Sequence, residues 1–209
     1  MKSVSHIGAL AAAGIAIVIL STGSAPSAPK RGAGLMADDI AIAHTPPGGW
    51  GRTFPKPVLA KCTEPLVKGA PDLRGIWKIV SIRRDDKPLP KGDPMYAYAE
   101  RIEQCGNRIV DMGHGQIADA RADGTFKNAV HEVSAFDYKT PIVAVASYED
   151  GVFVLRPAPV VWIPVTLPWL KVTRRLDAHG HMVWIRPDQG HQTAVLERIG
   201  GPNDTYTIH

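Results

Sequence analysis

The chain is poor in cysteine and lacks the spaced motifs that mark common catalytic and nucleotide-binding sites. Of its 209 residues only Cys62 and Cys105 are cysteines, too few for a structural zinc site built from thiolates alone. It contains no Gly-x-Ser-x-Gly nucleophile motif, no glycine-rich phosphate loop before a helix and no dinucleotide fingerprint after a strand. These absences argue against the corresponding hydrolases, nucleotide-dependent enzymes and zinc proteins, and we expect no cofactor.

A concentrated charge of one sign is also missing. Basic and acidic residues are mixed along the chain and leave a formal net charge of +4. The basic clusters are short and none is interleaved with aromatic residues: Lys30-Arg31, Arg83-Arg84 and Arg174-Arg175. Because nucleic-acid binding needs a concentrated basic face, we expect no nucleic-acid partner.

The longest apolar run lies near the amino terminus. Lys2 precedes fourteen apolar and small residues, Ile7 to Leu20. This length suits the apolar part of a secretion signal better than a membrane span, which needs about 20 residues. Pro26 makes the following cleavage region poor, so an uncleaved anchor is the alternative. We expect residues 1–25 to be a signal peptide or an amino-terminal anchor, and the protein to be periplasmic or secreted.

Export bears on the two cysteines, because disulfides persist in oxidising compartments. We expect Cys62 and Cys105 to form one disulfide, with two unrelated buried thiols as the alternative. Residues 26–71 between leader and domain contain three runs rich in proline or glycine, which hold regular structure poorly. We expect a linker here. Trp50 and Phe54 are large for a tether and favour a strap packed on the domain, and a disordered tether is the alternative.

From Asp72 onward, short alternating segments are joined by tight turns rich in glycine, asparagine and aspartate. The pattern predicts about nine strands, among them 74–84, 101–105, 108–112, 125–135 and 192–199. Strands joined by tight turns pair antiparallel, and a meander removes its edges best by closing. We therefore predict an all-β protein with an antiparallel up-and-down β-barrel of eight to nine strands over residues 72–200, followed by a tail over 201–209. A two-sheet sandwich is the alternative.

The segment Asp72-Leu73-Arg74-Gly75-Ile76-Trp77 resembles the Gly-x-Trp opening of lipocalins and the wider calycin superfamily. Segments 102–110 and 177–184 are similar to hairpins of lipocalin-like bacterial proteins. The resemblance covers about residues 72–199 and implies structural roles for Gly75 and Trp77 at the first strand. It also implies that a late arginine, Arg198 or secondly Arg186, packs over Trp77, as the attraction of a guanidinium to an indole face allows. The chain departs from the family in having no predicted helix after the last strand.

A second departure is the proline-rich apolar segment 156–170, which interrupts the late strands. Four prolines exclude a helix and a regular central strand, yet the segment is too apolar for a solvated loop. It is either a lid or rim over an apolar cavity, a surface that contacts a membrane through residues 157–170, or an irregular edge strand packed on the core. Trp162 and Trp169 would shape the entrance in the first of these interpretations.

Several polar residues are candidates for chemistry. His179, His181 and His191 have part of the spacing of a metal set, but the first two occupy a hairpin turn and no carboxylate follows at the required spacing, so we expect no metal site. A histidine that faces a cavity can act as a base near neutral pH. We name His131 as candidate base and Tyr138 as candidate donor, with Asp119 as the third catalytic candidate.

The leading functional hypothesis is an exported lipocalin-like protein that binds a small hydrophobic or amphipathic molecule in its lumen. The alternative is a cofactor-independent lyase, isomerase or cyclase acting on a hydrophobic substrate in the same cavity, and a third is a structural envelope module without a usable lumen. Converging ionisable groups in the cavity would favour the enzyme. The predicted ligand-binding residues are Trp77, Trp162, Trp169, Trp184 and Arg121. The predicted core contains Ile76, Trp77, Ile79, Val80, Ile109, Val143, Val145, Val154, Val183, Trp184, Ile185, Val195 and Leu196.

Overall fold

The computed structural model describes residues 34–209 except 160–164, 168, 188 and 189. The leader predicted over residues 1–25 and the predicted ligand-binding residue Trp162 lie outside the described residues. In the part of the chain that is described, none of the helices has the length and apolar character needed to cross a bilayer. The helical elements there include two short 3-10 turns, η1 (Ala37–Asp39) and η2 (Pro94–Ala97).

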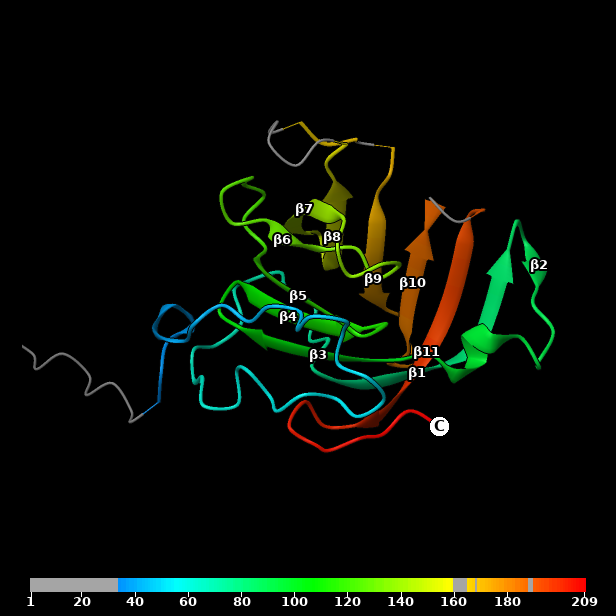
Figure 1. Cartoon of the computed structure of the whole chain (residues 1–209), viewed down its shortest axis with the longest axis horizontal. Helices are drawn as coiled ribbons and strands as arrows, with labels where there is room; N and C mark the ends of the chain where they lie inside the picture. The colour runs from blue at the N-terminus through cyan, green and yellow to red at the C-terminus, as the bar shows by residue number, and fades with distance from the viewer. Residues whose placement is uncertain (1–33, 160–164, 168, 188–189) are drawn as a thin grey trace, which may run out of the picture. The chain divides into compact units, whose positions relative to one another are not determined.

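One antiparallel sheet makes up the domain (Figure 1). Its strands are β1 (Gly75–Arg84), β2 (Lys87–Pro88), β3 (Ala99–Cys105), β4 (Arg108–Gly113), β5 (Gln116–Arg121), β6 (Val130–Val133), β7 (Pro141–Glu149), β8 (Val152–Pro157), β9 (Val172–Leu176), β10 (Met182–Arg186) and β11 (Gln192–Gly200). The strand order is β5-β4-β3-β1-β11-β10-β9-β8-β7-β6, and β2 pairs with β1 outside this path. The predicted all-β class and antiparallel pairing are confirmed.

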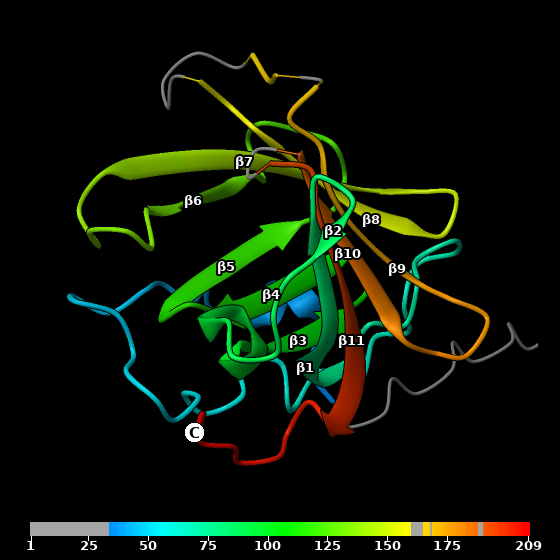
Figure 2. The same cartoon turned by 90° about the vertical axis from the view of Figure 1, so that its right-hand side faces the viewer.

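The sheet curls into a nearly closed barrel, which is compatible with a lipocalin-like fold (Figure 2). Pairing of β1 with β11 joins the first and last strands. The remaining seam lies between β5 and β6, where backbone pairing is incomplete. There the Arg121 amide donates to Asn128 O at 3.0 Å, and the side-chain amide of Gln116 donates to Val133 O at 2.6 Å. A side chain thus supplies part of the bonding that a strand ladder would otherwise provide.

The period-2 alternation of the strands sorts side chains between the lumen and the outer face. The residues that fill the lumen share full or nearly full burial and include Trp77, Ile102, Ile109, Phe153, Met182 and Leu196. Val80, predicted to lie in the core, is 37% exposed, because strand alternation places it on the face opposite the lumen residue Ile79. The register of β1 against β11 shifts between Ile79 and Ser81 and brings Ile82 back to the lumen.

Residues 34–63, which we call the strap, cover the outer face of β3, β4 and β5. Phe54 and Leu59 of the strap are buried there with Val110, Met112 and Ile117. The indole of Trp50 donates to Gln116 O at 2.9 Å, and a β-bridge joins Thr53 to Thr207 of the tail. The sequence left two interpretations of this segment, a packed strap and a disordered tether. In the structure, residues 34–63 pack on the barrel as a strap.

The strand predicted over residues 125–135 is shorter in the structure, where β6 begins only at Val130. The side chain of Asp123 accepts hydrogen bonds from Thr125 N at 2.9 Å and from Asn128 Nδ2 at 2.5 Å. These bonds hold the preceding residues in a turn, since an aspartate side chain competes with the strand ladder for nearby donors. β2 is an additional, two-residue strand that the sequence did not reveal.

Candidate functional site

One end of the lumen is packed shut around Trp77, which has no exposed surface. Its indole donates to Leu73 O at 2.7 Å, and Leu73 N donates to the side-chain oxygen of Gln104 at 2.7 Å. The amide group of Gln104 in turn donates to the Tyr148 hydroxyl at 2.9 Å. Trp77 is therefore a packing and closing residue at this end, consistent with the structural role that the resemblance implies.

The other end of the lumen contains a cavity of about 170 Å³, which we call the inner cavity. Its apolar lining consists of Ala118, Val130, Ile142, Ala144, Leu155, Val172 and Trp184, and its polar lining includes Tyr98, Asp111, His114, Gln116, Arg174 and Arg186. A second cavity of about 510 Å³, the outer cavity, shares several of these residues and extends to Ser134, Phe136 and Pro157. The two cavities are adjacent, because Ile142, Ala144, Leu155 and Val172 line both, and only the inner one reaches Asp111 and Arg174.

Glu100, Asp111 and Arg174 form an ion cluster at this floor. Arg174 Nη2 lies 2.8 Å from Glu100 Oε2 and 2.7 Å from Asp111 Oδ2, and Arg174 Nε donates to Glu100 Oε1 at 3.1 Å. The Tyr98 hydroxyl donates to Glu100 Oε2 at 2.7 Å. Glu100 has no exposed surface, and Asp111 and Arg174 are 9% and 4% exposed. Charges buried to this extent need partners, and here one guanidinium serves two carboxyl groups.

Strand alternation explains why these charges point inward. Glu100 is two residues from the lumen residue Ile102 on β3, Asp111 is two residues from Ile109 on β4, and Arg174 lies two residues from Val172 on β9. Each charge therefore shares the inner face of its strand with apolar neighbours. The cluster joins strands from opposite halves of the sheet path, β3 and β4 on one side and β9 on the other.

The environment separates the two carboxyl groups in acidity. Burial raises the pKa of Asp111 to about 7, and the negative charge of Glu100 adds to the rise while Arg174 opposes it. Burial also acts to raise the pKa of Glu100, but the charge and hydrogen bonds of Arg174 outweigh it and lower that pKa overall. The pair therefore holds one proton near neutral pH, in the way of two interacting carboxyl groups at one site.

The ring of Trp184 forms another part of the floor. It stacks on Tyr98 with ring centroids 5.2 Å apart, and the guanidinium groups of Arg174 and Arg186 lie 5.3 and 5.2 Å from its centroid. The His114 ring packs on Tyr98 in a tilted arrangement with centroids 4.4 Å apart, and desolvation and the nearby arginines lower its pKa although the residue is partly open to solvent. The predicted ligand-binding residue Trp184 thus lines the inner cavity.

Some polar atoms of the floor have no hydrogen-bond partner among the described residues. They are Arg174 Nη1, Asp111 Oδ1, Trp184 Nε1 and the side-chain amide of Gln192. All four residues lie at inward positions of their strands, and three of them line the inner cavity. A buried polar atom without a partner costs about 1–3 kcal/mol, so these atoms are the unsatisfied polar groups in and beside the floor.

Comparisons of the sequence with known proteins suggest no function, so a functional argument has to start from the site. No protein-family model and no curated protein matches the sequence. A fold of this kind accommodates many activities, so function has to be derived from the geometry and charges of the lumen.

The predicted catalytic residues lie away from the inner cavity. Asp119 points to the outer face, where Arg108 binds both of its oxygens at 2.8 and 2.7 Å. His131 contacts Phe126 O at 3.1 Å, and both Asp119 and His131 line a cavity of about 120 Å³ at the β5–β6 seam. Tyr138 lies elsewhere, in the β6–β7 connection, and donates to His114 O at 2.8 Å. The structure brings Asp119 and His131 to one cavity and leaves Tyr138 apart, and their catalytic roles stay predictions.

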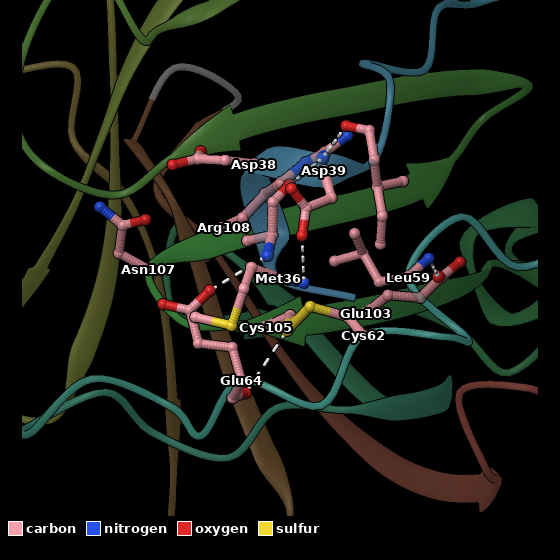
Figure 3. Close-up of a disulfide and its surroundings, with 12 residues drawn as sticks. Met36, Asp38, Asp39, Leu59, Cys62, Glu64, Glu103, Cys105, Asn107 and Arg108 are labelled. Carbon is pink, nitrogen blue, oxygen red and sulfur yellow. Dashed lines mark hydrogen bonds between the residues drawn. A yellow bond between two sulfur atoms is a disulfide. The ribbon is translucent and has the colours of Figure 1, made fainter. Parts of the chain in front are cut away.

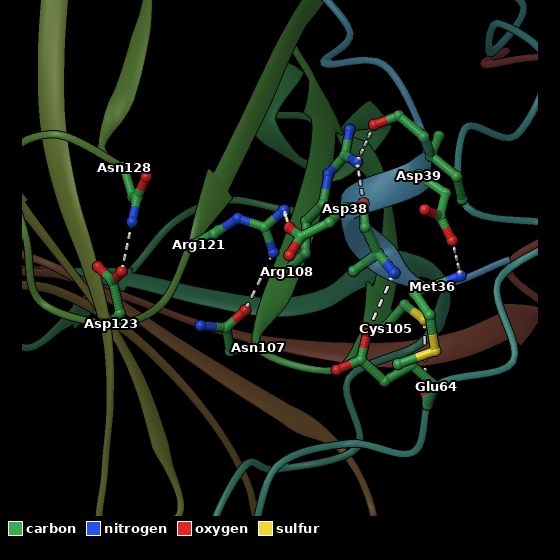
Figure 4. A network of polar contacts seen from close by, with 12 residues as sticks. Met36, Asp38, Asp39, Glu64, Cys105, Asn107, Arg108, Arg121, Asp123 and Asn128 are labelled. Atoms are coloured by element: carbon green, nitrogen blue, oxygen red, sulfur yellow. Dashed lines mark hydrogen bonds and ion pairs between the residues drawn. The ribbon is translucent and has the colours of Figure 1, made fainter.

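Arg121 and Trp169, both predicted to bind ligand, also lie outside the lumen. Arg121 is on the outer face, where it forms an ion pair with Asp38 of the strap and donates to Asn107 at 3.3 Å (Figure 4). Trp169 is 69% exposed in the β8–β9 connection. Neither arrangement tests ligand binding, and both assignments stay predictions.

The strap is fixed to the barrel by a disulfide and by one arginine. Cys62 of the strap and Cys105 of β3 form the predicted disulfide, with Cα atoms 6.2 Å apart (Figure 3). Glu64 lies beside the two sulfur atoms, but disulfide sulfurs offer no thiolate to a metal. Arg108 donates to the carbonyl oxygens of Ala37, Ile40 and Ala41 at 2.6–2.8 Å. Figure 4 shows this guanidinium pointing from β4 into the η1 turn.

The ion cluster was missed in the sequence. Asp111 was one of several polar residues that the sequence allowed to line a mouth or lumen, whereas Glu100 and Arg174 were interpreted as ordinary surface charges, since most charged residues are solvated. The available signal was position: Glu100 falls between Tyr98 and Ile102 in the strand period, and Asp111 follows Ile109 in the same way. A charged residue that alternates in step with apolar residues on a predicted strand shares their face of the sheet. If that face is known to be the inner one, the charge is buried and needs an ionic partner.

Proposed function

We propose that the protein binds a small amphipathic molecule in its lumen, with the apolar part in the two cavities and the polar part at the ion cluster. The observation that carries the proposal is the inner cavity itself, which has apolar side walls and a charged floor and shares lining residues with the larger outer cavity. Ligand sites of small molecules combine apolar enclosure with a few placed polar groups in this manner. Binding would derive mainly from apolar area removed from water.

Substitution of Ala144 by tryptophan tests this function, because Ala144 lines both cavities. The neutral dye Nile red should gain fluorescence with the native protein and lose that gain with Ala144→Trp. The matched control is Ala178→Trp, which places the same side chain in an exposed turn between β9 and β10. Thermal unfolding establishes that both variants are folded. Equal dye binding by the two variants would contradict lumen binding.

A second candidate function is a cofactor-independent lyase, isomerase or cyclase in the same lumen. The observation that favours it is the convergence of ionisable groups on the inner cavity, with the pKa of Asp111 raised by burial to about 7. Native mass spectrometry of protein purified from its own host, with denaturing extraction of the bound molecule, separates the two functions. A binder returns an added copy of the extracted molecule unchanged, whereas an enzyme converts it.

Export to the periplasm or exterior is part of the proposal. The Cys62–Cys105 disulfide supports an oxidising compartment. A reporter fused to residues 1–40 should leave the cytoplasm, and retention inside the cell would contradict export.

We also propose that residues 157–170 contact a membrane surface, supported by the 54% and 69% exposure of Val165 and Trp169. Their replacement by serine should reduce sedimentation of the protein with lipid vesicles.

A further inference from the structure

The hydrogen-bonding groups of the floor restrict the polar part of the ligand. Arg174 Nη1 and Trp184 Nε1 are donors, both residues line the inner cavity, and neither atom has a partner among the described residues. Both atoms are covered by neighbouring side chains, so a ligand reaches them by displacing part of the floor packing. Arginine and tryptophan side chains have no acceptor. A ligand that satisfies these two atoms must therefore offer an acceptor oxygen or nitrogen.

The charges of the ion cluster restrict the ligand further. Arg174 already faces two carboxyl groups, Glu100 at 2.8 Å and Asp111 at 2.7 Å. A ligand carboxylate would add a third negative group to a site that is almost fully buried, where an uncompensated charge is costly. A neutral acceptor avoids this cost and still receives the two hydrogen bonds.

From these contacts, and resting on the proposed binding function, we infer that the ligand presents a neutral carbonyl group to Arg174 and Trp184, as an ester, ketone or amide does. The apolar remainder of the molecule lies against Ile142, Ala144 and Leu155 and extends toward the mouth. The chemical class is thus a carbonyl-bearing amphiphile, and carboxylates and amines of the same length are weaker ligands.

Asp111 makes the binding depend on pH. Its Oδ1 atom has no partner in the described part of the chain, and the groups that face it are Glu100, Arg174, Arg186, Tyr98 and His114. While Asp111 holds its proton, Glu100 and Arg174 balance each other and an acceptor oxygen is tolerated. When Asp111 ionises, its charge repels that oxygen. Because burial raises the pKa of Asp111 to about 7, affinity should fall as pH rises through this value.

The experiment is calorimetric titration of four probes with one apolar chain: decane, methyl decanoate, decanoate and decylammonium. At about pH 6 the ester should bind about tenfold more tightly than decane or either ion, the ratio expected when the two hydrogen bonds together add about 1.4 kcal/mol to binding. Its affinity should fall severalfold between about pH 6 and about pH 8. The variant Asp111→Asn, neutral at every pH, should bind the ester without pH dependence.

The matched control is Asp150→Asn, which removes a carboxylate from the exposed β7–β8 turn and should keep the native pH dependence. Equal affinity for all four probes, or a preference for decanoate or decylammonium, would overturn the inference while lumen binding stands. If the affinity of Asp111→Asn for the ester still depends on pH, the role of Asp111 is overturned. If no probe binds in a manner sensitive to Ala144→Trp, the proposed function itself fails.

Discussion

The guanidinium of Arg198 on β11 lies 4.7 Å from the centre of the Trp77 ring on β1, so the last strand covers the tryptophan near the start of the first. Arg198 also donates to Asp72 O at 2.9 Å. This is the pair that the lipocalin resemblance implied, with Arg198 rather than Arg186, which lies instead over Trp184. The arrangement links the first and last strands of the chain, which pair in the middle of the sheet path.

Replacing Arg198 by alanine should lower the free energy of unfolding by about 0.5–2 kcal/mol, because the ring loses its cation and Asp72 O loses a donor. Arg198→Lys should retain part of the stability. Urea denaturation measures the difference, and Arg175→Ala, an exposed arginine on β9, is the control. An unchanged unfolding midpoint for Arg198→Ala would show that the stack does not stabilise this end of the barrel.

Replacing Arg108 by methionine should lower the free energy of unfolding by about 3–5 kcal/mol. The change leaves Asp119 buried without its cation and leaves three strap carbonyl groups without a donor. Limited proteolysis should then cleave within residues 34–63 before the barrel unfolds. The double variant with Asp119→Asn removes the uncompensated charge and should recover part of the loss. Protection of the strap equal to that of the native protein would contradict the anchoring role.

Replacing both Cys62 and Cys105 by serine should lower the free energy of unfolding by about 2–4 kcal/mol, because the disulfide closes a loop across 43 positions of sequence. Labelling of the unfolded, unreduced protein with a thiol reagent should find no free cysteine. The same labelling after reduction should find two, which serves as the control. Full labelling before reduction would show that the pair is not bonded in the isolated protein.

The stability of the protein should depend on pH through Asp111. Its folded-state pKa of about 7 lies above the ordinary value of 3.8, so the folded protein keeps a proton that the unfolded chain releases between these values. The contribution of Asp111 to the free energy of unfolding is therefore largest below about pH 4 and decreases as pH rises to about 7. Asp111→Asn should gain stability relative to the native protein over that range, as followed by urea denaturation at several pH values. Asp150→Asn should remain parallel to the native protein, and a constant difference between Asp111→Asn and the native protein would contradict the buried titration.

Local chemistry was sufficient to predict the sheet from sequence. Turns such as Asp150-Gly151, whose φ angles of 49° and 79° suit a two-residue hairpin, separate strands whose alternation is plain in the printed residues. The disulfide followed from compartment and cysteine number. The strap was one of two open interpretations, since Trp50 and Phe54 indicate burial but not the surface against which they pack.

The candidate site was beyond the reach of the same reasoning. Glu100, Asp111 and Arg174 come together only because β3 and β4 curl around to face β9, and that contact depends on the closure and register of the whole sheet. Strand periodicity states that Asp111 and Ile109 share a face, but not which face is the inner one. The bulge at Ile79–Ser81 shows the same difficulty, because one register shift places Ile82 in the lumen although it lies three residues after the lumen residue Ile79.

The strap has a practical consequence for anyone who shortens this chain. A version that begins at residue 72, where the strand pattern starts, would uncover Val110, Met112 and Ile117 on the outside of the barrel. It would also leave Cys105 as a lone thiol and Arg108 with only Asp119 as partner. Such a fragment would have an exposed apolar patch beside a reactive sulfur, the combination that leads to precipitation and to disulfide-linked dimers on storage.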